Sequence, residues 1–317
     1  MQADDIPIEV REITKKYGEQ TAVDKISFSV RQGSVFGLLG PNGAGKTTTI
    51  RMIMNILIPD SGSISILGRP STEVASRAIG YLPEERGLYK KMKVLDHIVF
   101  LGEIRGIGSK LAKTRAHEWL ARLDIESWAT KKVEELSKGM QQKIQFIGCV
   151  IHDPAILILD EPFSGLDPVN ARVLKDLILE FKARGKTLLF STHIMEQAEK
   201  LCDEIALVNR SRIVLQGTIA EVKRKFSGNR IRVHGSGDFE KLRTIDGVSD
   251  LVLSNGSAEV ELDPRVEKSR FLREAAAVCD LDSVMPIEAS LDEIFIKTVS
   301  VDNAPVPSPI QPAGAVQ

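Results

Sequence analysis

The chain has 317 residues, of which 43% are apolar and 27% charged, enough for a sizeable core in one large domain or two smaller ones. Its formal net charge of −1 gives no electrostatic case for binding nucleic acid, and no nucleic-acid partner is expected. The longest apolar runs, such as residues 146–151 and 155–159, fall far short of the roughly 20 residues that a membrane-spanning helix needs. We therefore expect a soluble chain that reaches a membrane only by binding something already there.

The cysteines and the first residues indicate a cytoplasmic protein. Cys149, Cys202 and Cys279 are far apart and odd in number, and no pair has the spacing of a metal site. Residues 1–5 are acidic and lack the charged-then-apolar order of a signal peptide. We expect buried, reduced thiols and no zinc site.

Strand patterns and helical patterns alternate along the first 225 residues. Strands are expected at residues 8–13, 26–30, 34–39, 64–67, 78–82, 155–159, 187–190 and 205–208. Helices are expected at residues 48–56, 113–123 and 173–183, and the whole stretch from 94 to 151 is helical in character. This alternation predicts an α/β fold with a parallel sheet that helices cover on both faces.

The character of the chain changes after about residue 228. Residues 231–233 and 257–262 read as strands and residues 271–278 as a helix, which is enough for a small α+β domain at 228–300. Ser290 and Glu293 have the spacing of a capping box in front of a further helix. Residues 301–317 hold four prolines and are expected to be a disordered tail.

A glycine-rich loop lies between the expected strand 34–39 and the expected helix 48–56. It consists of Gly40, Pro41, Asn42, Gly43, Ala44, Gly45, Lys46 and Thr47, and Thr48 follows it. Glycines allow backbone angles that let several N–H groups converge on one anion, and the following helix adds its positive end. Lys46 supplies a point charge for the outer phosphates, and the Thr47 hydroxyl is a suitable ligand for magnesium. The loop therefore predicts a nucleotide–phosphate site.

Two acids, Asp160 and Glu161, end the expected buried strand 155–159. Ligands of open α/β sheets bind at the carboxyl ends of the strands, and paired carboxylates resist burial unless a cation joins them. A magnesium–phosphate complex would give each acid a role, with Asp160 holding magnesium and Glu161 orienting or deprotonating the attacking water. A surface Asp-Glu pair is the alternative. His193 follows the strand 187–190, at the same edge of the sheet, where it would contact the outer phosphate.

In this order the motifs resemble those of ATP-binding subunits of the ABC transporter family. Residues 40–47 resemble the Walker A loop, and residues 156–161 resemble the Walker B strand with its catalytic glutamate. Residues 136–140 resemble the LSGGQ segment, and residues 164–167 the D-loop. Over residues 6–225 the resemblance implies a P-loop NTPase core with an N-terminal antiparallel β subdomain and a helical subdomain at about 92–150.

The resemblance also implies roles for single residues and for partners. Tyr17 would stack on adenine, His193 would be the switch histidine, and Asp167 would contact the nucleotide. Each ATP would lie between the phosphate loop of one chain and Ser137 and Gly139 of another, in a homodimer or a pair with a similar subunit. Because Ser137 precedes an expected helical run, its hydroxyl and the helix N-terminus would both face a phosphate. ATP and magnesium are the implied cofactors.

The sequence departs from the family pattern at two places. Glu84 stands where the family has a glutamine near magnesium, so a further carboxylate would lie beside the outer phosphate. The LSGGQ-like segment has Lys138 and Met140 in place of Gly and Gln, but it keeps Ser137 and Gly139. We expect nucleotide binding to survive both changes.

Residues outside the Walker motifs are similar to a subgroup of exporter-type subunits. Residues 83–89 and 291–295 carry this narrower likeness, and sodium-efflux and drug-resistance ATP-binding proteins are its familiar members. It implies an ATPase that drives separate membrane subunits and lies peripherally on the inner face of the cell membrane. The alternatives are a soluble ABC-type ATPase that works on DNA or ribosomes and a nucleotide-gated regulator without a transport partner.

Overall fold

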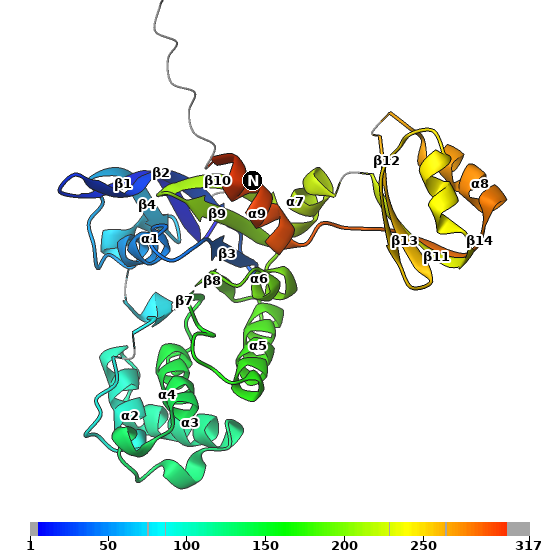
Figure 1. Cartoon of the computed structure of the whole chain (residues 1–317). Coiled ribbons are helices and arrows are strands. Elements are labelled where there is room, and N and C mark those ends of the chain that lie inside the picture. The colour runs from blue at the N-terminus through cyan, green and yellow to red at the C-terminus, as the bar shows by residue number, and fades with distance from the viewer. Residues whose placement is uncertain (1–5, 75, 86, 228, 264, 303–317) are drawn as a thin grey trace, which may run out of the picture. The chain divides into compact units, whose positions relative to one another are not determined.

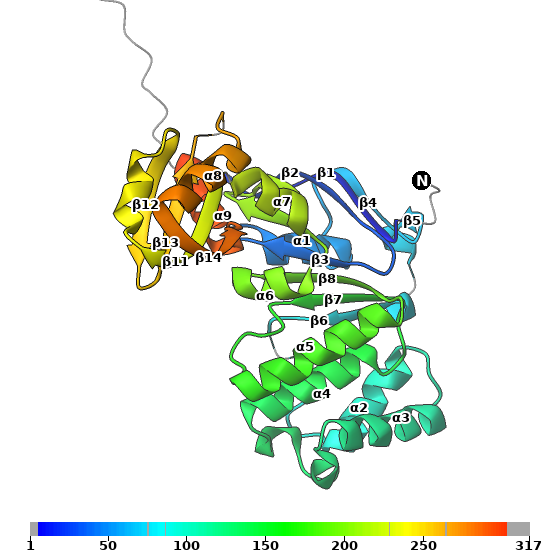
Figure 2. The same ribbon diagram turned by 90° about the vertical axis from the view of Figure 1, so that its right-hand side faces the viewer.

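The computed structural model of the protein describes residues 6–74, 76–85, 87–227, 229–263 and 265–302. The chain divides into two compact units, with the boundary between Val222 and Lys223. Figures 1 and 2 show the elements of each unit. None of the helices within the described ranges has the length and apolar character needed to span a bilayer.

The first unit begins with an antiparallel sheet in the order β2-β1-β4-β5. Its strands are β1 (Ile8–Tyr17), β2 (Gln20–Val30), β4 (Ser61–Ile66) and β5 (Arg69–Pro70). The apolar side chains that alternate along β1 and β2 are buried on one face, which is why period-two patterning predicted strands at residues 8–13 and 26–30.

A six-stranded sheet in the order β10-β9-β3-β8-β7-β6 forms the centre of the first unit. Its strands are β3 (Val35–Leu39), β6 (Ile79–Leu82), β7 (Ile156–Asp160), β8 (Thr187–Thr192), β9 (Glu204–Asn209) and β10 (Arg212–Thr218). The strands from β9 to β6 are parallel, as expected, but β10 pairs antiparallel with β9 at the edge. The sheet is therefore mixed rather than purely parallel, as is common for large α/β sheets.

Seven helices belong to the described part of this unit or start in it. They are α1 (Lys46–Ile53), α2 (Val94–Ile104), α3 (Ser109–Arg122), α4 (Lys138–Val150), α5 (Pro168–Ala183), α6 (Met195–Leu201) and α7 (Ile219–Phe226), and short 3-10 turns lie at Ser71–Glu73, Ser76–Ala78, Glu126–Trp128 and Val133–Glu135. Helices α2, α3 and α4 gather at the opposite end of the unit from β1, β2 and β4 (Figure 1). This helical part corresponds to the stretch expected at about 92–150.

Alternate residues of the central strands enter two different hydrophobic cores. In β7, Leu157 and Leu159 pack in the core that α2 to α6 complete, whereas Ile156 and Ile158 pack in the core shared with α1 and the antiparallel sheet. Both faces are buried, which explains why β7 reads as a continuous apolar run. The expected α/β fold, with its antiparallel β part and its helical part, is confirmed.

The second unit has its own sheet and its own core. The strands β11 (Arg230–Gly237), β12 (Val248–Ser254), β13 (Ser257–Leu262) and β14 (Cys279–Pro286) form an antiparallel sheet in the order β12-β13-β11-β14. Helix α8 (Lys268–Val278) contributes Phe271 and Ala275 to a core with strand residues such as Val233 and Val260, and a 3-10 turn lies at Phe239–Thr244. Helix α9 (Leu291–Asp302) begins after Ser290, whose hydroxyl accepts a hydrogen bond from the Glu293 N–H.

Several element boundaries differ from the sequence expectations. Helix α1 begins at Lys46 and ends at Ile53, whereas residues 48–56 were expected, because Gly45 ends the loop in a left-handed conformation. Strands β5, β10, β12 and β14 and helix α6 were not predicted. Helix α9 runs through Asp302, two residues into the segment expected to be a tail. The rest of that expectation, residues 303–317, lies outside the described residues.

Candidate nucleotide site

Three glycines give the loop after β3 its shape. Gly40, Gly43 and Gly45 have φ angles of 149°, 80° and 107°, in the range that favours glycine. A Cβ on Gly40 would lie 2.1 Å from the Val208 carbonyl oxygen, and a Cβ on Gly45 would lie 2.3 Å from that of Ala22. Only glycine fits at these two positions, and the loop delivers the chain directly into the first turn of α1. The N–H groups of that turn have no helical partner and are available to an anion.

The side chain of Lys46 lies against the backbone of this loop. Its Nζ donates hydrogen bonds to the carbonyl oxygens of Gly40, at 2.8 Å, and Pro41, at 3.1 Å. The same Nζ lies 3.3 Å from Oε1 of Glu161, and both side chains are almost fully buried. A buried ammonium group that faces both the loop and a carboxylate is placed to bind the outer phosphates of a nucleotide.

Asp160, the last residue of β7, is buried with one oxygen bonded and the other free. Its Oδ1 accepts hydrogen bonds from the Ser191 hydroxyl, at 2.5 Å, and the Thr47 hydroxyl, at 3.3 Å. Its Oδ2 has no hydrogen-bond partner among the described residues. Burial raises the pKa of Asp160 above its ordinary value, and the two hydroxyl hydrogen bonds only partly offset this effect.

Glu161 follows in a strained backbone conformation. Its φ of 47° is unusual for a residue with a side chain, and such strain costs about 1–3 kcal/mol when the surrounding structure imposes it. The Glu161 N–H donates to the Ser191 hydroxyl at 3.0 Å. Its Oε2 lies 3.0 Å from Nδ1 of His193, and its Oε1 has no hydrogen-bond partner within the described ranges, although Lys46 is near.

The Asp160 oxygen without a hydrogen-bond partner among the described residues and the Thr47 hydroxyl are suitable ligands for a magnesium ion. Asp160 Oδ2 and the Thr47 hydroxyl are hard oxygen donors on neighbouring segments, joined by the hydrogen bond between Thr47 and Asp160. Magnesium keeps several water ligands and needs only one or two protein oxygens besides phosphate. A site of this kind does not need a cluster of three or more acidic, histidine or cysteine side chains, and the described residues contain no such cluster.

The structure thus brings Lys46, Thr47, Asp160, Glu161 and His193 together at one edge of the central sheet. His193 is 43% exposed and reaches Glu161 from the chain that follows β8. Strand register explains the meeting, because Asp160 pairs with Ser191 in the parallel ladder of β7 and β8.

Ser191 was missed by sequence reasoning. Its fully buried hydroxyl donates to Asp160 and accepts from the Glu161 N–H, so one side chain fixes both acidic residues. A signal existed, since Ser191 is a polar residue at the end of a buried strand and precedes His193 by two positions.

Ser137, Gly139 and Asp167 form a separate group at the starts of α4 and α5. Ser137 caps α4, and its hydroxyl accepts a hydrogen bond from the Met140 N–H at 3.3 Å. Asp167 caps α5 by accepting from the N–H groups of Val169 and Asn170, and the Asn170 N–H is the largest cause of the lowered pKa of Asp167. Within the described chain, no hydrogen bond or ion pair joins this group to Lys46 or Glu161.

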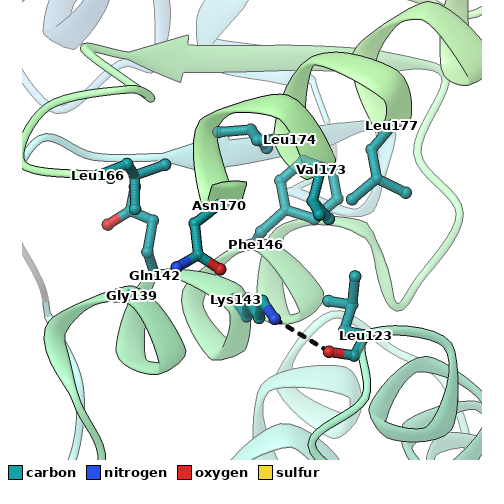
Figure 3. A pocket seen from close by; sticks show the side chains of 10 residues that line it. All are labelled: Leu123, Gly139, Gln142, Lys143, Phe146, Leu166, Asn170, Val173, Leu174 and Leu177. Carbon is teal, nitrogen blue, oxygen red and sulfur yellow. Dashed lines mark hydrogen bonds between the residues drawn. The ribbon is translucent and has the colours of Figure 1, made fainter. Parts of the chain in front are cut away.

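Asn170 links the two helix starts, as Figure 3 shows. Its side-chain amide donates to Asp167 Oδ2 at 2.5 Å, and a Cβ on Gly139 would lie 2.6 Å from the same amide nitrogen. The apolar pocket beside it, lined by Phe146, Leu174 and Leu177 among others, has a volume of only about 20 Å³. That is room for one water molecule at most, so this pocket is a packing feature and not a ligand site.

Tyr17 and Glu84 lie apart from the polar cluster. Tyr17 is the last residue of β1 and is 51% exposed, with no ring contact to another described residue. Glu84 is exposed in the bend after β6. Burial raises the pKa of Tyr81 to about 12, and the charges of Asp160 and Glu84 add to this rise, so both carboxylates act on the Tyr81 hydroxyl.

The chain is similar to known proteins over most of its length. The family model described as ABC transporter matches residues 23–164, and the model described as ATP-binding protein DrrA1-3-like, C-terminal domain, matches residues 217–299. The ABC transporter ATP-binding protein YhaQ of Bacillus subtilis is 43% identical over 297 residues, which are 90% of this chain and 96% of YhaQ.

Two further relatives extend the likeness. The Nod factor export ATP-binding protein I of Ralstonia nicotianae is 37% identical over 75% of this chain and 75% of its own. A solved structure of an ATP-binding subunit of an ABC transporter is 32% identical and superposes with a TM-score of 0.65 over 69% of this chain and 92% of its own. These relatives support a transporter subunit over an ATPase of DNA or ribosomes. The chain belongs to the ATP-binding proteins of ABC transporters.

Proposed function

We propose that this subunit hydrolyses ATP and that hydrolysis drives export through separate membrane subunits. The observation that carries the hydrolysis is the pair of buried acids, Asp160 and Glu161. Each has one carboxylate oxygen without a hydrogen-bond partner among the described residues, and that of Glu161 lies 3.3 Å from Lys46 Nζ. Burying two carboxylates side by side is unfavourable unless cations and a reacting water use them. Export is inferred from the Ralstonia nicotianae relative, whose name assigns it to Nod factor export.

Each residue of the polar cluster has a distinct task in this proposal. The loop N–H groups and Lys46 bind the phosphates, and Tyr17 receives the adenine. Thr47 and Asp160 would hold magnesium, which would neutralise charge on the phosphates. Glu84, in the bend after β6, would be a further oxygen ligand of that magnesium.

Glu161 is the general base. Its Oε2 is already hydrogen-bonded to His193 Nδ1 at 3.0 Å, so the carboxylate is held in one orientation toward the phosphate loop. A water molecule in front of the outer phosphate would then give its proton to Glu161 as it attacks. The positive φ of Glu161 supports a catalytic role, because backbone strain concentrates at such sites.

The nucleotide pocket is completed by a second chain. Ser137 and Gly139 do not contact the Lys46 cluster in one copy, yet Ser137 begins a 13-residue helix whose N-terminus favours an anion. We infer that these residues contact the outer phosphate of ATP bound to a second copy or a similar subunit. The assembly would lie on the inner face of the cell membrane, bound to its transmembrane subunits.

Two substitutions test the proposed hydrolysis. Glu161→Gln should keep ATP affinity and lower the hydrolysis rate by a factor of about 100 or more, because it removes the general base. Lys46→Ala should weaken ATP binding itself. Calorimetry of ATP binding and release of phosphate, measured on both variants, separate the two effects, and an unchanged hydrolysis rate in Glu161→Gln would sink the assignment.

The membrane partner is tested by capture from membranes. When the Glu161→Gln variant with ATP serves as bait, it should capture a protein with several membrane-spanning segments. Export by membrane vesicles should require both this chain and the captured protein. If only soluble proteins are captured and ATP hydrolysis is normal, the chain is a nucleotide-gated regulator and the transport part of the proposal is wrong.

A further inference from the structure

A cleft lies between α5 and α6, away from the phosphate loop. Its volume is about 570 Å³, inside the range of roughly 300–1,000 Å³ that holds small organic ligands. Figures 1 and 2 show α6 beside α5, and the two helices are in contact. The side chains of Phe163 and Leu201 give the cleft an apolar wall.

Two cations line the cleft without a partner. Arg172 and Lys175 are one turn apart on α5, and across the described chain neither makes a recorded hydrogen bond or a salt bridge. Lys175 is half-buried, and an ammonium group that loses water without gaining an anion is unfavourable. On the opposite wall, Glu196 is already paired with Lys200, and Lys175 acts on Glu196 only as a more distant charge.

Asp176 is the one other acid of the lining. It is exposed, and it is four residues after Arg172 on α5, yet no ion pair of 4.0 Å or less joins the two. The lining therefore holds three cations and two acids, and two of the cations, Arg172 and Lys175, lie one turn apart on α5. Two such groups on one side of a small cleft suit a carboxylate or a phosphate group.

The walls of the cleft are attached to the catalytic segments. Phe163 comes two residues after Glu161 and packs edge-on against Phe190 of β8, with ring centroids 6.3 Å apart. Gln197 accepts a hydrogen bond from the Thr192 hydroxyl at 3.4 Å, and Thr192 precedes His193. A molecule in the cleft would therefore touch the neighbours of both the proposed base and the histidine that orients it.

We propose that the α5–α6 cleft binds a small organic anion with an apolar body and that this ligand adjusts ATP hydrolysis. The anionic group pairs with Arg172 and Lys175, and the apolar body lies against Phe163 and Leu201. Phe163 and Gln197 transmit occupancy to Glu161 and His193. The effect on hydrolysis rests on the function proposed above, whereas binding to the cleft does not.

Binding is tested on the full chain with the fluorescent probe 8-anilinonaphthalene-1-sulfonate, an aromatic anion of this class. The variant Arg172→Gln/Lys175→Gln should bind the probe about tenfold more weakly, because it loses charge-assisted contacts. Lys175→Arg should bind as the unmodified chain does. A matched control is Lys110→Gln/Lys113→Gln on α3, which removes two exposed charges far along the sequence from the cleft and should leave the affinity unchanged.

Displacement of the probe distinguishes the chemistry of the natural ligand. Benzoate and phenyl phosphate share the apolar body, and the stronger competitor shows whether a carboxylate or a phosphate is preferred. Equal affinity of the Arg172→Gln/Lys175→Gln variant and the unmodified chain would overturn the site, as would displacement of all bound probe by ATP.

The regulatory part is tested by the hydrolysis rate at saturating benzoate. The rate of the unmodified chain should change at least about twofold, and the response should be absent from Arg172→Gln/Lys175→Gln. An equal response in both proteins, or none in the unmodified chain, contradicts regulation through the cleft. If the chain hydrolyses no ATP at all, the proposed function fails while the probe measurements still decide the site.

Discussion

Asp160 and Glu161 are adjacent acids whose surroundings assign them different tasks. Asp160 Oδ1 is bonded to two hydroxyl groups and its Oδ2 is free, which suits a cation. Glu161, whose backbone has a positive φ, instead contacts Lys46 and His193. The proposed metal ligand and the proposed base thus have different partners.

Asp160→Asn should stabilise the folded chain in the absence of nucleotide, although it removes a proposed magnesium ligand. The pKa of Asp160 is raised from 3.8, so the folded chain loses stability as the pH rises through the raised value and the buried group becomes charged. Without nucleotide or magnesium, the Asp160→Asn variant should melt at a higher temperature than the unmodified chain at neutral pH. The difference should disappear at a pH below 3.8, where Asp160 is protonated in both states.

Magnesium and ATP should reverse this order of melting temperatures, so that the unmodified chain melts at the higher temperature. They should raise the melting temperature of the unmodified chain more than that of Asp160→Asn, because only the unmodified chain keeps the charged ligand. Thermal unfolding followed by circular dichroism at several pH values measures both effects. A variant that is less stable at neutral pH and equally stabilised by magnesium and ATP contradicts the assignment of Asp160.

Glu84→Gln tests the departure at the bend after β6. The carboxylate is exposed and acts on the Tyr81 hydroxyl together with Asp160, so replacing it by a neutral amide lowers the negative charge near the outer phosphate. We expect magnesium-dependent hydrolysis to be kept or raised up to about threefold. Complete loss of hydrolysis would show that the carboxylate itself is required.

At the scale of elements, strand register brings together site residues that are far apart in the sequence. The parallel pairing of β7 with β8 sets Asp160 beside Ser191, and the next turn of the chain brings His193 to Glu161. The helices contribute their starts: α1 follows the phosphate loop, and Ser137 and Asp167 cap the N-termini of α4 and α5. The site is built from ends of elements that are far apart in sequence.

Helix α2 carries a buried histidine that the function does not use. His97 is fully buried, both of its ring nitrogens lack hydrogen-bond partners among the described residues, and Tyr89 packs edge-on against it with ring centroids 5.7 Å apart. Burial lowers the pKa of His97 from 6.5 to about 4. The unfolded chain therefore takes up a proton first, and the folded state loses stability as the pH falls from 6.5 toward 4.

His97→Leu should remove this penalty. The variant should be more stable than the unmodified chain by about 1–3 kcal/mol at neutral pH, because it eliminates buried polar atoms without partners. The advantage should widen as the pH is lowered from 6.5, whereas the contribution of His152, whose pKa is also lowered to about 4, cancels in the comparison. Urea unfolding at a series of pH values measures the difference, and a constant or shrinking gap would contradict the explanation.

At the scale of the whole molecule, we expect the sites on one copy to require a second. The Lys46 cluster and the Ser137 group belong to the same unit but share no recorded contact within the described residues. The α9 helix and the α+β sheet form part of the second unit, which has a core of its own.

An ATP-dependent dimer is the expected consequence. Glu161→Gln with ATP should elute from size exclusion as a dimer, and Glu161→Gln/Ser137→Glu should stay monomeric because the added carboxylate would face the phosphates of the partner's ATP. Adding Ser109→Glu instead places the same charge at the start of α3 and should leave the dimer intact. A dimer of equal strength in all three proteins would show that Ser137 does not complete the pocket.

The sequence by itself determined the local chemistry of this protein. The glycine spacing from Gly40 to Gly45 determined a phosphate loop, because only glycine accepts those backbone angles and the close approach of the Ala22 and Val208 carbonyls. The apolar run of β7 determined a buried strand with acids at its end. Strands such as β12 and β14, which carry many polar residues, could not be predicted, because pairing with their neighbours stabilises them more than their own patterning does.

Only the tertiary structure decided which of these residues meet. Ser191 is 30 residues from Glu161 in the sequence, and only the β7–β8 pairing makes it the hydroxyl that holds both acids. The cleft of Arg172 and Lys175 likewise exists because α6, a helix that the sequence did not reveal, packs beside α5. Backbone angles are local and can be read from residue types, whereas contacts between distant segments depend on how the whole core packs.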